Sequence, residues 1–215
     1  NWLEAAGKMS IPTNLGTPGL VNSSKVPNAG PAIYEVAHSP SIPAANQAVV
    51  VTARVHDPDA PVTLQLKYRV DPSASYSTAT MTDNGAGGDA IASDGIYSAT
   101  IPAQAGGTVV AFYVQANDSS SVLTRFPTDL INGAPVRECV VYFGDTVAAS
   151  GFGSYHLWLT QANIDRWSNL PDLSNEPHDG TWVYGNRIIY NMVSTFSGSP
   201  YHQQFDSPIG SPCHY

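Results

Sequence analysis

One stretch of the chain gathers residues that bind metal ions: Asp83 to Gly95 contains three aspartates and four glycines. Glycine adopts the positive φ angles of tight turns, and Asp and Asn side chains bond back to nearby backbone, so the stretch predicts a long ordered turn between two strands. A small loop with several carboxylates offers the oxygen ligands that calcium prefers. The candidate calcium ligands are Asp83, Asn84, Asp89 and Asp94. Alternatively, these side chains only stabilise turns, since their spacing does not match an EF-hand.

A second group of metal-ligand types lies near the C-terminus, at His202, Asp206, Cys213 and His214. Their spacing matches no standard zinc pattern, so a zinc site there is a minor alternative. The two cysteines, Cys139 and Cys213, allow one disulfide or two unpaired buried thiols.

The chain shows no residue set for nucleophilic catalysis. It has no Gly-x-Ser-x-Gly motif, and the glycines of 151–154 precede no phosphate-binding lysine, so that stretch is interpreted as a linker. We therefore predict no catalytic residue.

Aromatic residues crowd the last third of the chain. Stacked rings there could hold a sugar, or they could form a small aromatic core, which is the simpler interpretation because strands and a helix need apolar faces to bury. The set is Trp158, Trp167, Trp182, Tyr184, Tyr190 and Tyr201.

The composition excludes some classes of binding partner. Nine Lys and Arg against seventeen Asp and Glu give 215 residues a net charge of −8, which argues against nucleic acid and anionic membrane surfaces. No apolar run reaches the roughly 20 residues that span a bilayer. Only 12% of residues are charged, and this Lys-poor composition is typical of exported bacterial modules, so we predict an extracellular or cell-surface location. The termini, Asn1 and Tyr215, suggest a processed product or a piece of a longer polypeptide.

Period-two alternation of apolar and polar residues predicts a mainly β fold with an immunoglobulin- or fibronectin-like sandwich over residues 31–145. The expected strands cover 48–56, 62–70, 76–81, 95–101, 108–117 and 137–143. Residues 1–30 form a Pro/Gly-rich extended lead-in, and 146–215 form a small α+β part expected to lean on the sandwich. In that part, Thr160 caps a predicted helix over 161–167, and Gly185-Asn186 joins a predicted hairpin.

Residues 155–205 resemble the start of the CotH kinase-like domain of large secreted bacterial proteins. The resemblance rests on Leu157-Trp158-Leu159-Thr160, Asn163-Ile164-Asp165-Arg166-Trp167, Ser174-Asn175-Glu176-Pro177, Tyr184-Gly185, Ile188-Ile189-Tyr190-Asn191 and Ser197-Gly198-Ser199-Pro200-Tyr201-His202. The stretch 51–59 with the Gly/Asp loop is similar to the Ig-like module that precedes such domains, and residues 1–22 look like the end of a lamin-tail-like domain.

The resemblance implies an ATP-dependent protein kinase, but the chain departs from that chemistry. The family's catalytic aspartates lie in a later lobe, and all three lysines, Lys8, Lys25 and Lys67, precede the kinase-like part. We therefore expect a non-catalytic structural or interaction module that can self-assemble and whose partners are other copies or surface proteins. The alternatives are the front fragment of a CotH-like kinase and a glycan-binding module.

Overall fold

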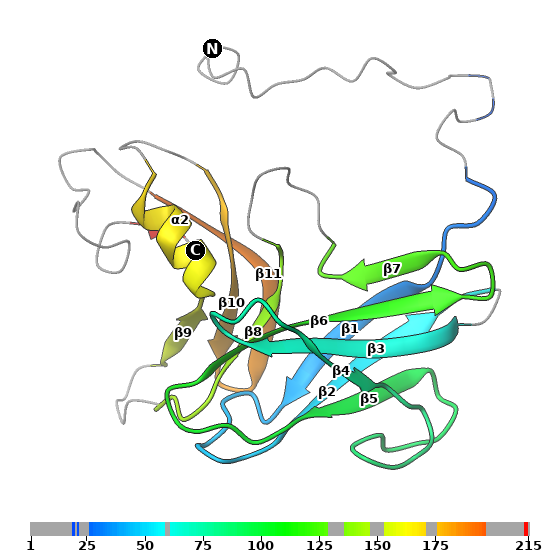
Figure 1. Cartoon of the computed structure of the whole chain (residues 1–215), viewed down its shortest axis with the longest axis horizontal. Coiled ribbons are helices and arrows are strands. Elements are labelled where there is room, and N and C mark those ends of the chain that lie inside the picture. The colour runs from blue at the N-terminus through cyan, green and yellow to red at the C-terminus, as the bar shows by residue number, and fades with distance from the viewer. Residues whose placement is uncertain are drawn as a thin grey trace.

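The computed structural model describes residues 19, 21, 26–58, 61–128, 136–146, 153–170, 176–196 and 213–214. These residues form a mainly β fold with a single helix among them (Figure 1). The elements are β1 (Ala32–Ser39), β2 (Val49–His56), β3 (Pro61–Val70), β4 (Ser77–Thr80), β5 (Ile96–Ile101), β6 (Val109–Asp118), β7 (Leu123–Phe126), β8 (Cys139–Tyr142), β9 (Tyr155–Trp158), α2 (Gln161–Ser168), β10 (His178–Tyr184), β11 (Arg187–Phe196) and β12 (Cys213–His214).

Two antiparallel sheets face each other and make the sandwich. One has the order β1-β2-β5, and the other has the order β4-β3-β6-β7. Strand β8 also pairs with β6, along Val109–Phe112, whereas β7 pairs with the later half of β6. Strand β6 is therefore the centre of the larger sheet.

The buried core follows the alternation of apolar and polar residues that the sequence predicts. Apolar residues two apart on β2 and β6 point inward and are almost fully buried, as are Leu64 and Leu66 on β3. The buried residues of β2 and β6 are Val49, Val51, Ala53, Val55, Val110, Phe112, Val114 and Ala116. Burying these side chains stabilises the sandwich by roughly 1.5–3 kcal/mol for each large one.

A third sheet, β12-β11-β10-β9, packs against the end of the sandwich. Tyr190 of β11 inserts into the sandwich core, where its ring contacts Phe112 and Phe126 edge-on. Arg137 pairs with Asp179 at 2.9 Å across the same junction. The part beginning at residue 146 thus shares a core with the sandwich, in line with the expectation that it leans on it.

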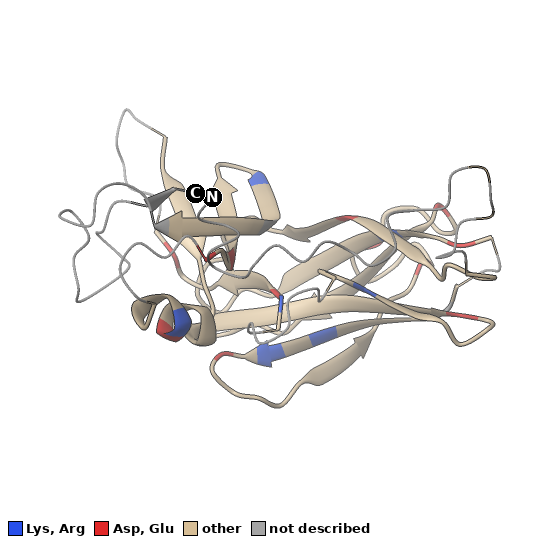
Figure 2. Ribbon diagram, turned by 90° about the horizontal axis from the view of Figure 1, so that it is seen from above, with Lys and Arg blue, Asp and Glu red and all other residues tan. Residues whose placement is uncertain are grey.

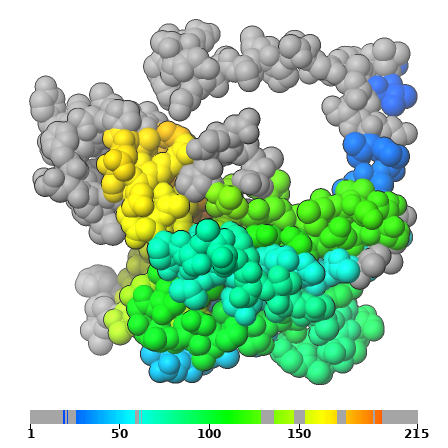
Figure 3. Space-filling view, viewed as in Figure 1, coloured from blue at the N-terminus to red at the C-terminus, as the bar shows by residue number. Residues whose placement is uncertain are grey.

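Helix α2 begins where the sequence indicated. The Thr160 side chain accepts a hydrogen bond from the Asn163 backbone N–H, which satisfies one of the free donors of the first turn. Trp167 packs its ring on His178 of β10 at 5.3 Å, so the helix covers the beginning of that strand. Figure 3 shows the helix against the turn that follows β3, where the Gln161 N–H binds Asp71 at 2.7 Å.

The mainly β prediction is confirmed, and the six expected strands appear as β2, β3, β4, β5, β6 and β8. Strands β1 and β7 had no individual prediction. The lead-in 1–30 is described only at 19, 21 and 26–30, where Asn28 donates to Asp118 at 2.5 Å. Within the described ranges, no helix has the length and hydropathy to cross a membrane.

Candidate functional site

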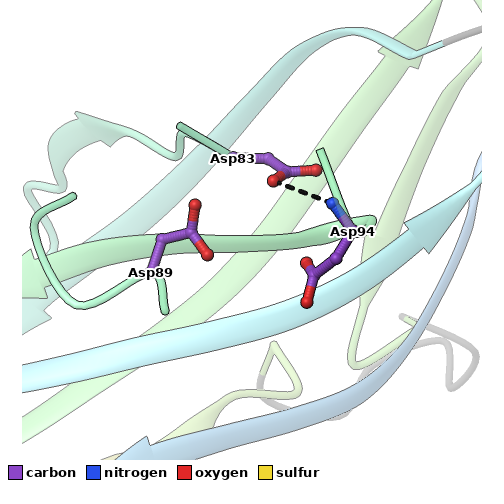
Figure 4. A group of neighbouring side chains, drawn as sticks. All are labelled: Asp83, Asp89 and Asp94. Atoms are coloured by element: carbon purple, nitrogen blue, oxygen red, sulfur yellow. Dashed lines mark hydrogen bonds between the residues drawn. The ribbon is translucent and has the colours of Figure 1, made fainter. Parts of the chain in front are cut away.

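The Gly/Asp loop brings three of its predicted metal ligands together. One carboxylate oxygen from each of Asp83, Asp89 and Asp94 lies within 4.8 Å of the others (Figure 4). Asp89 is almost buried, whereas Asp94 is exposed. The loop connects β4 to β5, so both of its ends are fixed by the sandwich.

Backbone N–H groups hold the three carboxylates in place. Asp83 accepts from the N–H of Asp94 at 3.3 Å and of Gly95 at 2.8 Å. Asp89 accepts from Gly85 at 2.5 Å and from Ile91 at 3.2 Å.

Asp94 accepts from the Ile96 N–H at 2.9 Å. Each carboxylate oxygen can accept more than one hydrogen bond or ligand bond, so these contacts leave capacity for a cation.

Within the part of the chain that the structure describes, no ion pair neutralises the carboxylates of the loop. Arg54 pairs with Glu35 at 2.8 Å and donates to the backbone carbonyl of Asp94, not to a triad carboxylate. Asn84, the fourth predicted ligand, uses its side-chain oxygen to accept from the Ala86 N–H at 3.1 Å. Three close carboxylates repel each other, and a hard divalent cation would relieve that repulsion.

The glycines permit this geometry. Gly88 has a φ of +105°, and a Cβ on it would lie 2.5 Å from the Val50 side chain. Only glycine therefore lets the loop fold back onto β2 at this point.

The aromatic residues divide into a buried group and an exposed group. Trp158, Trp167 and Tyr190 are at most 9% exposed, so the aromatic-core interpretation describes these three. Tyr201 lies outside the described residues.

The exposed group is the aromatic surface, defined as Tyr155 of β9 with Trp182 and Tyr184 of β10. Tyr155 is 62% exposed and Tyr184 is 39% exposed. The Tyr155 ring lies 4.6 Å from that of Tyr184 and 5.2 Å from that of Trp182, at interplanar angles of 16° and 9°. Tyr155 is missing from the aromatic set that the sequence indicates, although its cross-strand pairing with Tyr184 makes it the central member of this surface.

The two faces of β10 explain why this surface is open. Val183 and Thr181 point toward the sandwich, where Val183 is fully buried and the Thr181 hydroxyl accepts from the Val140 N–H at 2.8 Å. Trp182 and Tyr184 stand on the opposite face. Helix α2 covers only the other end of the strand, at His178.

Asp145, which follows β8, fixes β9 from its inner side. Its Oδ2 lies 2.7 Å from His156 Nδ1 and accepts from Trp158 Nε1 at 2.9 Å. One carboxylate thus anchors two alternate residues of β9 and turns Tyr155 and Leu157 to the outer face.

A buried ion network lies below α2. Arg69 binds both oxygens of Glu138, at 2.8 and 2.5 Å, and Asp71 at 2.7 Å. The Tyr76 hydroxyl donates to Glu138 at 2.5 Å, and burial together with this carboxylate raises the pKa of Tyr76 to about 12. The network borders a hollow of about 310 Å³ that also includes Ala162. Because its charged groups bind each other, we interpret it as structural.

Two groups that could serve as base or nucleophile are buried. His38 accepts from the Tyr190 hydroxyl at Nδ1 and donates from Nε2 to the Ser41 carbonyl at 3.1 Å, and burial lowers its pKa to about 4. Cys139 is fully buried, and burial raises the pKa of its thiol. Neither side chain is accessible to a substrate.

The side chains of the predicted C-terminal zinc ligands, one of which is also a predicted disulfide cysteine, lie outside what the structure describes. His202 and Asp206 lie outside the described residues, and Cys213 and His214 are described only as the backbone of β12. The Cys139–Cys213 disulfide and the C-terminal zinc site therefore stay predictions.

Comparison with known proteins gives no assignment: the chain matches no family model and no curated protein. The CotH resemblance stays a prediction that rests on its short motifs.

Proposed function

We propose that the chain is a non-catalytic interaction module that acts outside the cell. The observation that carries the proposal is the aromatic surface: three nearly parallel rings with Tyr155 62% exposed, on a sheet whose opposite face is buried. A cluster of two exposed Tyr side chains and a half-buried Trp favours a binding role, since such rings add large contact area at low cost in conformational entropy.

The neighbourhood of the surface also favours binding over chemistry. Ile189 of β11, the cross-strand neighbour of Trp182, is 42% exposed and extends the apolar area. Arg187 is the neighbour of Tyr184 and supplies a cation at its margin. Basic residues elsewhere are few and scattered (Figure 2), which does not favour nucleic acid as the partner.

Two association assays test the proposal. Self-association is measured by sedimentation velocity, and binding to a panel of insoluble polysaccharides is measured by co-sedimentation. We expect at least one assay to detect association that the double variant Tyr155→Ser/Tyr184→Ser reduces about tenfold or more. The control is Tyr34→Ser, which changes a tyrosine of β1 that is 42% exposed and lies outside the aromatic surface. Identical behaviour of the wild type and the double variant in both assays would contradict the proposal.

We further propose that the Gly/Asp loop binds calcium as a structural ion. Calcium should raise the Tm of the wild type because it binds the folded loop and not the unfolded chain. Asp94→Asn should raise the Tm without calcium, since it removes one repelling charge, and should weaken the response to calcium. A Tm that is unaffected by millimolar calcium would rule out a site of useful affinity at the triad.

A further inference from the structure

The outer edge of β9 has no partner strand among the described residues. Strand β9 ends the sheet β12-β11-β10-β9, and its four residues pair with β10 on one side only. Among the described residues, none forms a backbone hydrogen bond to its other side. Alternate N–H and C=O groups of β9 are therefore available to a further strand.

Four other strands in the described structure carry features that hinder pairing at their edges. Strand β1 is interrupted by a register shift between Tyr34 and Ala37, with Glu35 at a φ of +50°. Strand β4 is four polar or small residues long.

Strand β7 contains Arg125 and is followed by Pro127. The Val140 N–H of β8 is bound by the Thr181 side chain. Bulges, charges, prolines and covering contacts of this kind keep sheet edges from associating.

Strand β9 is as short as β4, at four residues, but none of the other protections is seen on it among the described residues. Its sequence is Tyr155-His156-Leu157-Trp158, with no Lys, Arg, Asp, Glu or Pro, and its register with β10 has no shift. Asp145 holds it flat against the sandwich from the inner side. An unprotected apolar edge that is held in an extended conformation is suited to strand addition.

The aromatic surface lies directly beside this edge. Tyr155 belongs to β9 itself, and its ring stacks on Trp182 and Tyr184 of the next strand. An added strand would pack alternate side chains against Tyr155 and Leu157. Tyr and Trp are the residue types that contribute most to binding free energy when an interface covers them.

We propose that two copies of this chain pair through β9, antiparallel about a two-fold axis, so that their small sheets become one continuous sheet. This inference rests on the proposed function and names the partner of the same surface. A second copy fits because the edge is uncharged and self-complementary, as an isologous interface requires. Arg187 lies two strands away on β11, so the axis brings no like charges of this kind together.

The net charge gives the pairing a characteristic salt dependence. Each copy carries a charge of −8, so the copies repel each other at long range. Salt screens that repulsion over about 10 Å at 0.1 M, and dimerisation should therefore strengthen as salt is added. Binding of an acidic partner to Arg187 would instead weaken.

Sedimentation velocity on the full chain at increasing protein and salt concentration tests the proposal. We expect a monomer–dimer equilibrium that Tyr155→Lys weakens at least about tenfold, because it places two lysines across the axis. Tyr34→Lys is the matched control, since it makes the same change of charge on another exposed tyrosine and should leave the equilibrium unchanged.

Hydrogen exchange of the wild type supplies a readout that does not depend on a variant. Alternate β9 amides should exchange more slowly at high protein concentration than at low concentration. A chain that stays monomeric, a dimer without β9 protection, or equal effects of the two lysine variants would overturn the inference. Polysaccharide binding that needs Tyr155 and Tyr184 in a monomeric chain would overturn it while the proposed function stands.

Discussion

At the scale of single residues, His178 shows how burial sets the protonation state of a side chain. His178 is 1% exposed and stacks on Trp167, and neither of its ring nitrogens has a hydrogen-bond partner among the described residues. Burial, with a smaller contribution from Arg166, lowers its pKa to about 4. A neutral, unpartnered imidazole in this position costs free energy that an apolar ring would not.

We predict that His178→Phe is at least as stable as the wild type at pH 7. Phenylalanine keeps the stacking on Trp167 and removes two buried polar atoms without partners. Urea unfolding measures the difference in free energy, and a loss greater than about 1 kcal/mol would contradict the explanation.

The same histidine should make stability depend on pH. Its folded pKa, about 4, is below the unfolded value near 6.5, so the unfolded chain binds one more proton between these pH values. The titration of His178 therefore leaves the free energy of unfolding unchanged above pH 6.5. As the pH falls from 6.5 toward 4, it lowers the free energy of unfolding by up to about 1.4 kcal/mol per pH unit. His38 acts in the same direction.

In His178→Phe, the number of protons taken up on unfolding should be smaller by one between pH 6.5 and 4, so the free energy of unfolding should depend less steeply on pH. An unchanged slope in His178→Phe would show that the ring is protonated in the folded chain.

At the scale of elements, the buried Arg69–Glu138 pair joins β3 to β8. The side chains are 9% and 3% exposed, and Glu138 also binds Tyr76. Removing Glu138 leaves Arg69 with Asp71 as its remaining acidic partner and takes the acceptor from the Tyr76 hydroxyl, in a place with little water.

We predict that Glu138→Ala lowers the free energy of unfolding by about 3–5 kcal/mol. Glu35→Ala removes the partner of Arg54 at an exposed position, where Glu35 is 65% exposed, and should leave the urea midpoint unchanged. Equal effects of the two substitutions would mean that burial does not set the strength of these pairs.

Strand positions could be predicted from the sequence where alternation continues through a whole strand. The buried rows of β2 and β6 are of this kind. Val70, expected to face inward at the end of β3, is 42% exposed, because the strand reaches the turn at Asp71 there. Strand β1 is interrupted by its register shift and β7 has only four residues, so neither gives a clear period.

The candidate site was predictable only in part. Three aspartates in one glycine-rich loop predicted the triad, because a short loop confines them whatever the surrounding fold. The aromatic surface needed the register of β9 against β10, which places Tyr155 beside Tyr184 although the two residues are far apart in the sequence. Composition cannot distinguish these rings from buried ones such as Trp158, since only the placement of α2 and the sandwich decides which face is covered.

On the scale of the whole molecule, we predict one cooperative unfolding transition. Tryptophan fluorescence reports on α2 and the sheet β12-β11-β10-β9, through Trp158, Trp167 and Trp182. Far-UV circular dichroism is dominated by the sandwich strands. The shared core around Tyr190 couples them. Leu66→Ala, made in the sandwich, should destabilise by about 2–5 kcal/mol and shift both signals together. Separate transitions would show that the two parts unfold independently.

The insertion of Tyr190 into the sandwich also limits how this chain can be recombined. A protein engineer who transplants the sandwich alone, cut after Asp145, would leave a void beside Phe112 and an unsatisfied Nδ1 on His38. The smallest exchangeable block therefore extends at least from β1 through β11. Its boundaries are set by one tyrosine ring rather than by the change in composition near residue 146.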